Sequence, residues 1–294
     1  MSGLPILSVD PSREASPVGV WRPKLERLRR IFARPGRWVV CLSGGVDSAL
    51  VLAVAAEERP GDVVALTAVS PTLPDAERLT CERLAREAGV PHELVPSEEM
   101  ERDGFVSNGP DRCYHCKTEL YSVARRAAHR LGGDWIADGV NVSDLSDHRP
   151  GLVAAKEHRV VHPLVEAEMS KADVRGAARF LGLDVWDKPA FACLSSRFPY
   201  GTAITEEGLT QVGAVEGFLR ARDFRQVRVR SDGQTARIEV LPFDIPSLVT
   251  DPLRSELLAV AKAAGYRWTS VDLEGYRTGS LNAALEDPAS EGGE

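Results

Sequence analysis

A glycine-rich loop between a buried strand and a helix is the feature that most constrains how this chain folds. Residues 38–42 are apolar and predict a short buried strand, and residues 49–58 are typical of a helix. Between them lies Ser43-Gly44-Gly45-Val46-Asp47-Ser48. Adjacent glycines let the backbone approach a phosphate closely, and a helix N-terminus offers unpaired N–H groups at the positive end of its dipole. The segment therefore predicts an anion-binding site.

Strand and helix patterns alternate through the following 130 residues. The expected elements are strands at 63–69, 92–95 and 135–140, and helices at 76–88, 112–131 and 174–181. Such alternation indicates an α/β fold, with a mostly parallel sheet that is covered by helices on both faces. Ligands of such sheets bind at the carboxyl ends of the strands, which is where the glycine-rich loop lies.

A change of pattern near residue 200 predicts a second, smaller α+β domain. Its expected elements are helices at 206–222 and 252–264 and strands at 226–230, 236–241 and 268–273. Asp232-Gly233 between the first two strands is a hairpin turn signal. We therefore expect an α/β domain at 21–200 and a smaller domain at 201–285, with a disordered arm at 1–20 and a disordered tail at 286–294.

Composition narrows the cellular setting and the partners. Among the 294 residues, 36 Lys and Arg face 43 Asp and Glu, for a net charge of −7. This balance argues against a nucleic-acid partner, which usually requires a basic surface. No apolar run reaches the length of about 18 residues that a membrane span needs, and the N-terminus lacks the pattern of a signal peptide. We expect a cytoplasmic protein, and for its five cysteines a reducing compartment favours metal binding or catalysis over disulfides.

The polar residues of the loop suit a nucleotide. Ser43 and Ser48 add hydroxyl donors, and Asp47 is placed to hold the Mg²⁺ that accompanies ATP phosphates. The Walker A pattern is absent, which excludes the loop of kinase-like enzymes. The alternative is structural: a tight Ser-Gly-Gly turn followed by Asp47 as the N-cap of the helix.

Three of the cysteines form a pattern of their own. Cys113 and Cys116 are separated by two residues, and Cys193 follows 77 positions later. Two thiolates at this spacing can bind one metal centre, and a distant third can complete the site on folding. The alternatives are a buried pair near a helix start or a redox-active dithiol. Cys41 and Cys81 lie in apolar patterns and are expected to be structural.

Two segments carry a resemblance to known families. The loop resembles the pyrophosphate loop of the PP-loop ATP pyrophosphatases, which release pyrophosphate and leave AMP on their substrates. Residues 186–201 read Trp-Asp-Lys-Pro-Ala-Phe-Ala-Cys-Leu-Ser-Ser-Arg-Phe-Pro-Tyr-Gly. Together with the loop, this segment resembles the LarE family of ATP-dependent sulfur transferases, which mature the nickel-pincer nucleotide cofactor of lactate racemase. The resemblance covers about residues 37–285.

The resemblance implies a reaction and its participants. It implies that the loop residues bind ATP with Mg²⁺, that Ser70 lies near the adenosine, and that Cys193 handles the sulfur. The implied substrate is pyridinium-3,5-biscarboxylic acid mononucleotide. One branch of the family sacrifices the cysteine that matches Cys193, and another holds an iron–sulfur cluster with three cysteines. This chain has the three-cysteine pattern, which implies a [4Fe–4S] cluster on Cys113, Cys116 and Cys193, supplied by a sulfide donor.

Arginines at the start of the second domain suggest an anion site. Arg228 and Arg230 alternate on an expected strand and so share one face, and Arg197 lies four residues after Cys193. Guanidinium groups bind phosphate and carboxylate through paired N–H donors. The alternative is a solvated strand face on which Glu239 is the cross-strand partner. The resemblance favours the first interpretation, with Arg197, Arg228, Arg230 and Glu239 contacting the mononucleotide.

These observations lead to one expected reaction and two rivals. The expected enzyme adenylates a substrate carboxylate through Asp47 and the loop, and then delivers sulfur through Cys193 to give a thiocarboxylate. A tRNA thiolation enzyme also combines this loop with a CxxC and a distal cysteine, and it would bind tRNA tightly in a salt-sensitive way. A non-catalytic ATP-binding module would release no pyrophosphate. A homo-oligomer is compatible with the sequence, and no membrane partner is expected.

Overall fold

The computed structural model describes residues 19–146, 151–189 and 192–277. They form two compact units. The first unit consists of the residues up to Ser70, Asp75–Glu99 and residues 113–189, and the second consists of Pro71–Pro74, Met100–Arg112 and the residues from Ala192 on. The expected arm and tail lie outside the described residues, apart from Gly19 and Val20.

The first unit is built on a four-stranded parallel sheet. Its strand order is β3 (His92–Pro96), β2 (Val63–Val69), β1 (Trp38–Cys41) and β4 (Trp135–Ala137), and every adjacent pair is parallel. The chain runs outward from β1 to β2 and β3 and then returns to place β4 on the other side of β1. The predicted α/β fold with a parallel sheet is therefore confirmed.

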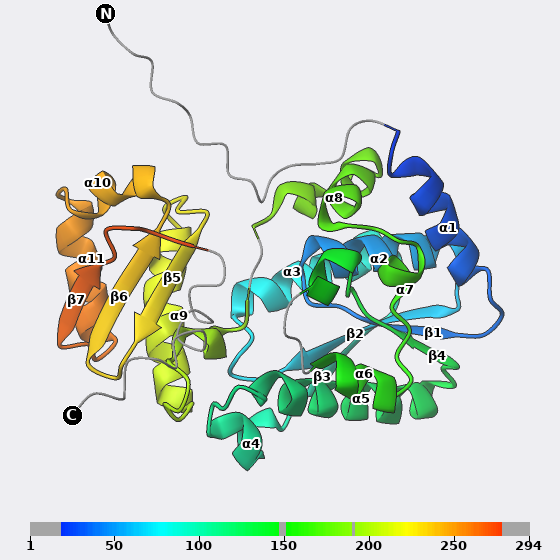
Figure 1. The fold of residues 1–294 in the computed structure, drawn as a ribbon, viewed down its shortest axis with the longest axis horizontal. Coiled ribbons are helices and arrows are strands. Elements are labelled where there is room, and N and C mark those ends of the chain that lie inside the picture. Colours follow the sequence, from blue (N-terminus) through cyan, green and yellow to red (C-terminus); the bar gives the residue numbers. More distant parts are fainter. Residues whose placement is uncertain (1–18, 147–150, 190–191, 278–294) are drawn as a thin grey trace, which may run out of the picture. The chain divides into compact units, whose positions relative to one another are not determined.

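Helices cover both faces of this sheet, as the alternation of β1 requires (Figure 1). Trp38 and Val40 belong to one hydrophobic core, and Val39 and Cys41 belong to the other. The first core is completed by residues of α1 (Arg22–Phe32), α2 (Val46–Glu58), α3 (Asp75–Glu87), α7 (Pro163–Glu166) and α8 (Lys171–Phe180). The second is completed by residues of α5 (Arg112–Leu131) and α6 (Gly151–Glu157).

Two elements depart from their expected bounds for local reasons. β4 ends at Ala137, three residues early, because the carboxylate of Asp138 accepts a hydrogen bond from the Val140 amide and turns the chain. α8 begins three residues before the expected start. Its N-cap is Ser170, which forms a reciprocal capping box with Asp173.

The second unit is a three-stranded sheet with helices. β5 (Val227–Ser231) and β6 (Thr235–Val240) are antiparallel, and β7 (Trp268–Val271) pairs with β6 in parallel after α11 (Leu253–Ala263). The predicted turn between β5 and β6 is confirmed: Gly233 has a φ of +91°, and the Asp232 carboxylate accepts from the amides of Gln234 and Thr235. α9 (Glu206–Arg220) packs on β5 and α11.

Short elements connect these parts. They are α4 (Asp103–Val106), α10 (Ile245–Leu248) and the 3₁₀ turns Glu99–Glu101, Val142–Ser146, Asp184–Asp187, Leu194–Arg197 and Pro242–Asp244. Among the described residues, none of the helices combines the length and the apolar character that a membrane span requires.

Candidate functional site

The glycine-rich loop follows β1, and its last residues form the first turn of α2. The N-cap of α2 is Gly45, which is in extended backbone and has no side chain to cap the first-turn amides. This end of the helix therefore presents the N–H groups and the dipole that an anion requires. Asp47 is the second residue of the helix and not its N-cap, so the alternative assignment of Asp47 as the N-cap is wrong.

Glycines make two close backbone approaches around the loop. Gly44 has a φ of +76°, and a Cβ there would lie 2.9 Å from a carboxylate oxygen of Glu77. Gly139, which follows β4, packs so tightly that a Cβ would lie 2.7 Å from the amide nitrogen of Ser48. β1 and β4 are neighbours at the point where the strand order reverses. The loop therefore lies at the topological switch point, where ligands of such sheets bind.

Asp47 is held from two sides by residues distant in sequence. One carboxylate oxygen lies 2.5 Å from Lys171 Nζ, and the other accepts from Asn141 Nδ2 at 3.1 Å. The same amide nitrogen donates to Asp144 at 2.9 Å. Two carboxylates thus meet around one amide at the start of α2. Oxygen ligands of this kind suit Mg²⁺, so the residues fit the ion that accompanies ATP.

A second lysine fixes the conformation of the loop. Lys188 Nζ donates to the carbonyl oxygen of Gly44 at 3.1 Å and pairs with Glu77 at 2.7 Å. Sequence reasoning misses both lysines, because they lie 124 and 144 positions from their partners in the loop. The signal that could have found Lys171 is its place directly after the N-cap Ser170, since a first-turn residue of α8 is fixed in position.

Ser70 lies just after β2, as expected, and its hydroxyl donates to Glu99 at 2.7 Å. Glu99 is buried and also accepts from the Cys116 thiol at 3.6 Å. The region assigned to adenosine is therefore connected to one cysteine of the CxxC through a single carboxylate. Cys113 is exposed, and it shares a face of α5 with Cys116, which is partly buried.

In the second unit, the Arg197 side chain holds the backbone around Cys193. Its guanidinium donates to the carbonyl oxygens of Ala192 and Cys193 at 3.0 and 3.2 Å. The side chain is fully buried and makes a two-pronged ion pair with Glu216, at 2.6 and 2.9 Å. The Cys193 side chain itself is exposed. Arg197 therefore fixes the backbone of the cysteine segment, while the Cys193 thiol remains accessible.

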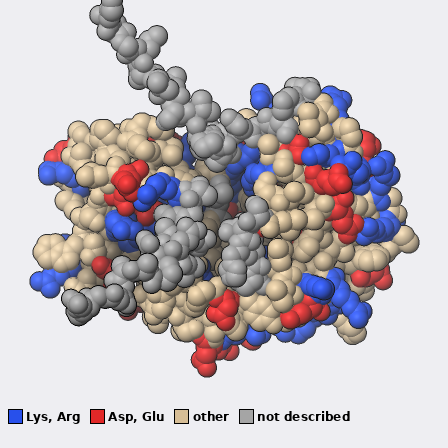
Figure 2. Space-filling view, in the orientation of Figure 1, with Lys and Arg blue, Asp and Glu red and all other residues tan. Residues whose placement is uncertain are grey.

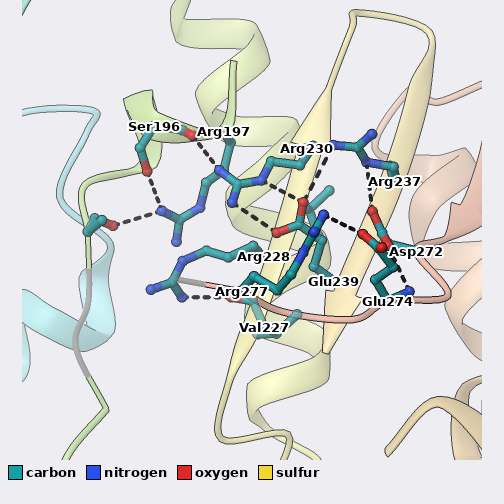
Figure 3. Close-up of polar contacts among 12 residues, drawn as sticks. Ser196, Arg197, Val227, Arg228, Arg230, Arg237, Glu239, Asp272, Glu274 and Arg277 are labelled. Atoms are coloured by element: carbon teal, nitrogen blue, oxygen red, sulfur yellow. Dashed lines mark hydrogen bonds and ion pairs between the residues drawn. The ribbon is translucent and has the colours of Figure 1, made fainter. Parts of the chain in front are cut away.

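Arg230 makes a parallel contact to the same segment. It pairs with both oxygens of Glu239 at 2.9 Å and donates to the Ser196 carbonyl oxygen at 2.7 Å (Figure 3). Glu239 is also approached by Arg237 at 3.5 Å. The pairing with Glu239 is thus present, but on a buried strand face and not on the solvated face of the alternative, and it coexists with a contact to the cysteine segment.

Arg228 is the most electrostatically strained residue of the group. It is nearly buried, lies 5.2 Å from the ring centre of Tyr276, and donates to the Val227 carbonyl oxygen at 2.8 Å. Burial and the neighbouring Arg197 lower its pKa from 12.5 to about 10. Because its environment opposes its charge, an incoming phosphate or carboxylate would stabilise it.

The structure distributes the three cysteines of the predicted cluster over both units. Cys113 and Cys116 belong to the first unit, and Cys193 belongs to the second. Within the described ranges, no group of three or more His, Cys, Asp and Glu side chains is arranged to hold a metal ion. The [4Fe–4S] cluster therefore stays a prediction from the sequence pattern.

Exposure and burial divide four of the five thiols into two chemical classes, and Cys116 is partly buried. Burial raises the pKa of Cys41 to about 12 and that of Cys81 to about 11. The reactive form of a cysteine is the thiolate, so both buried thiols are expected to be unreactive near neutral pH. We expect brief treatment with iodoacetamide to label Cys113 and Cys193, and to leave Cys41 and Cys81 unlabelled until the protein is unfolded. Peptide mass spectrometry measures this, and early labelling of Cys41 in the folded protein would contradict the assignment.

Comparison with known proteins agrees with this geometry. The family model described as asparagine synthase matches residues 36–142, which run from just before β1 to the segment after β4. The chain is 36% identical over 252 residues to the pyridinium-3,5-bisthiocarboxylic acid mononucleotide synthase of Lactiplantibacillus plantarum, which covers 85% of this chain and 90% of that protein. This chain belongs to the LarE family. The resemblance inferred from the loop and the cysteine segment is thereby confirmed. The comparison does not decide between the branch that sacrifices a cysteine and the branch that holds an iron–sulfur cluster.

Two further proteins are similar in sequence to this LarE-family chain. An uncharacterized protein of Synechocystis sp. is 45% identical over 262 residues, which is 89% of this chain and 98% of that protein. A tRNA-specific 2-thiouridylase of Xanthobacter autotrophicus is 31% identical over 194 residues, or 52% of this chain and 49% of that enzyme. The likeness to the thiouridylase thus extends over about half of each chain.

Proposed function

We propose that this protein is an ATP-dependent sulfur transferase that converts a carboxylate of pyridinium-3,5-biscarboxylic acid mononucleotide to a thiocarboxylate. The observation that carries the proposal is the loop at the switch point, where an uncapped helix start and Asp47 offer sites for phosphate and Mg²⁺. Family membership supports the substrate, because the named relative is a synthase of the bisthiocarboxylic acid mononucleotide.

The first step is adenylation. A carboxylate oxygen of the substrate attacks the α-phosphorus of ATP, the bond to the β-phosphate breaks, and pyrophosphate leaves. Magnesium at Asp47 would neutralise charge on the phosphates, and the amides of the first turn of α2 would bind the leaving pyrophosphate. Lys171, which pairs with Asp47 in this structure, would then be free to contact a phosphate oxygen.

The second unit would recognise the mononucleotide and present the sulfur. The positive field around Arg228, whose pKa is lowered by burial and by Arg197, favours a phosphate group. Arg197 and Arg230 hold the carbonyl groups of the Cys193 segment, which supports a role for these two arginines in positioning the cysteine. Direct contact of Arg197, Arg228, Arg230 and Glu239 with substrate remains part of the proposal.

The sulfur step follows from the acyl adenylate. A sulfur nucleophile attacks the acyl carbon, the C–S bond forms, and AMP leaves with the electrons of the C–O bond. If Cys193 is the donor, loss of its Cα proton and cleavage of its Cβ–S bond release the thiocarboxylate and leave dehydroalanine. This route transfers one sulfur per chain and needs neither Cys113 nor Cys116.

The three-cysteine pattern supports a cluster route instead. Cys113, Cys116 and Cys193 would supply three thiolates to a four-iron cluster, and such a cluster would supply exchangeable sulfide for the transfer. We therefore propose that Cys113, Cys116 and Cys193 hold a [4Fe–4S] cluster and that the enzyme turns over repeatedly with added sulfide. Anaerobic reconstitution with iron and sulfide is expected to load the wild type and not the Cys113→Ala, Cys116→Ala, Cys193→Ala triple variant. Equal iron in both would contradict the cluster.

A tRNA thiolation activity is the second candidate, favoured by the half-length likeness to a 2-thiouridylase. The charge distribution opposes it, because Lys and Arg side chains are intermixed with Asp and Glu on the face shown in Figure 2, and the total charge is −7. Incubating the anaerobically reconstituted protein with ATP, Mg²⁺, sulfide and either the mononucleotide or unmodified tRNA separates the two. We expect mass spectrometry to find sulfur in place of a carboxylate oxygen of the mononucleotide. Thiolated tRNA with unmodified mononucleotide would contradict the proposal.

A further inference from the structure

The residue that follows β4, Asp138, carries a buried carboxylate. Asp138 is almost completely buried, and each of its carboxylate oxygens is used. One oxygen accepts from His162 Nδ1 at 2.7 Å and from the Val140 amide at 3.1 Å. The other accepts from the Tyr121 hydroxyl at 2.6 Å. A buried carboxylate requires such donors, because an uncompensated one is very costly.

The charges around this carboxylate keep it ionised. Burial alone would raise the pKa of Asp138, but the surrounding groups, led by His162 and followed by Lys117 and Tyr121, hold it below its ordinary value. Burial and the adjacent Asp138 raise the pKa of Tyr121, so its hydroxyl remains a donor. The Asp138 carboxylate is therefore ionised near neutral pH, and its hydrogen-bond donors hold it in place.

Asp138 fixes the segment that supports the nucleotide loop. Its bond to the Val140 amide makes the turn at the end of β4, and the next residue, Gly139, lies against the Ser48 amide. At the end of the turn, Asn141 donates to Asp47. A shift of this turn would move Gly139 and Asn141 together, and with them the first turn of α2.

His162 reaches the turn from a separate part of the chain. Its neighbour Val161 forms an isolated parallel bridge with Ala137 of β4, and the Val161 carbonyl oxygen accepts from the Asp138 amide at 3.2 Å. The backbone of this segment and the imidazole thus hold Asp138 at two points. Tyr121, on α5, donates to the other carboxylate oxygen. The hydrogen bonds described for the side chains of Asp138, His162 and Tyr121 do not reach the glycine-rich loop itself.

We infer that His162 and Tyr121 are positioning residues, which act through Asp138 and Asn141 to hold Asp47 and the start of α2 in the geometry that binds Mg·ATP. This inference rests on the proposed use of ATP and adds residues that lie outside the nucleotide loop. Mutation of residues that hydrogen-bond to the binding residues of a metal site typically lowers metal affinity by about tenfold to a hundredfold. Such residues act without touching the substrate.

The inference predicts a specific pattern of nucleotide affinity. His162→Ala is expected to raise the KM and the dissociation constant for Mg·ATP about tenfold and to change kcat much less. His162→Asn places an amide donor at the position of Nδ1 and should restore most of the affinity. His158→Ala is the matched control, since His158 lies beside the Tyr121 ring but makes no hydrogen bond to Asp138 in the described structure.

A double-mutant cycle tests the route of the effect. If His162 acts through Asn141, the loss caused by His162→Ala should nearly vanish in an Asn141→Ala background. Mg·ATP binding is measured by calorimetry, and kinetics follow pyrophosphate release. Wild-type affinity in His162→Ala, with or without lower thermal stability, would overturn the inference while leaving the proposed function intact. Additive losses in the double variant would also overturn it. A wild type that binds no Mg·ATP would contradict the proposed function and the inference together.

Discussion

Asp47→Ala is expected to abolish substrate-dependent pyrophosphate release, with a loss of about a thousandfold or more. A carboxylate that positions the metal on the transferring phosphates contributes several kcal/mol to transition-state stabilisation, and each 1.4 kcal/mol is about tenfold in rate. Asp47 also holds the side chains of Asn141 and Lys171, so its removal also releases these two contacts to the loop. Pyrophosphate release in the presence of ATP, Mg²⁺ and the mononucleotide measures the effect.

A matched control separates chemistry from folding. Asp62→Ala removes a more exposed carboxylate of the same unit, which pairs with Arg59 at 2.6 Å, and should retain nearly full activity. Both variants should keep the thermal transition of the wild type within a few degrees, because neither carboxylate lies in a hydrophobic core. Pyrophosphate release by Asp47→Ala at the wild-type rate would remove Asp47 from the site.

Glu216→Ala is expected to give the largest loss of stability, about 3–5 kcal/mol. Glu216 is fully buried, pairs with Arg197 and Arg220, and accepts from the Val229 amide at 2.9 Å. Its removal leaves Arg197 and its neighbour Arg228 buried without their common counter-charge. The cost comes mainly from these uncompensated cations.

Urea unfolding of the full chain measures this loss, with an exposed ion pair of the same unit as control. Glu256 pairs with Arg222 at 2.8 Å, and both side chains are largely solvated, so Glu256→Ala should cost less than about 1 kcal/mol. Equal losses in the two variants would contradict the role of burial.

The same residue predicts how acid affects the second unit. Burial opposes ionisation of Glu216, but Arg197 and the other arginines outweigh it and hold its pKa below the ordinary value of 4.5. A lowered pKa means that the stabilisation is present above pH 4.5 and is lost as the pH falls through the folded pKa. Glu216→Gln, which cannot ionise, should therefore lose less stability than the wild type on acidification below pH 4.5.

Much of the first unit could be predicted because its signals are local. The apolar runs of β1 and β2, the glycines of the loop and the helical spacing of α5 each depend on neighbouring residues, and their elements lie where expected. The end of β4 could not be predicted from apolar pattern alone. There the Asp138 side chain competes for the backbone and ends the strand before Val140.

The site was harder to predict because its contacts are long-range. Ser43–Ser48 could be assigned from the motif, but the residues that support it, Lys171 and Lys188, come from segments that only folding brings near. Arg197 could be placed next to Cys193 from the sequence, but its fully buried pairing with Glu216 could not be predicted. Sequence shows that a residue is charged, but it does not show which buried partner compensates that charge.

The measurement that tests the account most directly is pyrophosphate release by the wild type under anaerobic conditions, with ATP and Mg²⁺, in the presence and absence of pyridinium-3,5-biscarboxylic acid mononucleotide. We predict that pyrophosphate forms only when the mononucleotide is present, and that AMP is released in equal amount once sulfide is added to displace it from the acyl adenylate. Unmodified tRNA should not replace the mononucleotide. Release of ADP and phosphate, or no nucleotide cleavage with the mononucleotide, would contradict the assignment of the loop to adenylation of this substrate.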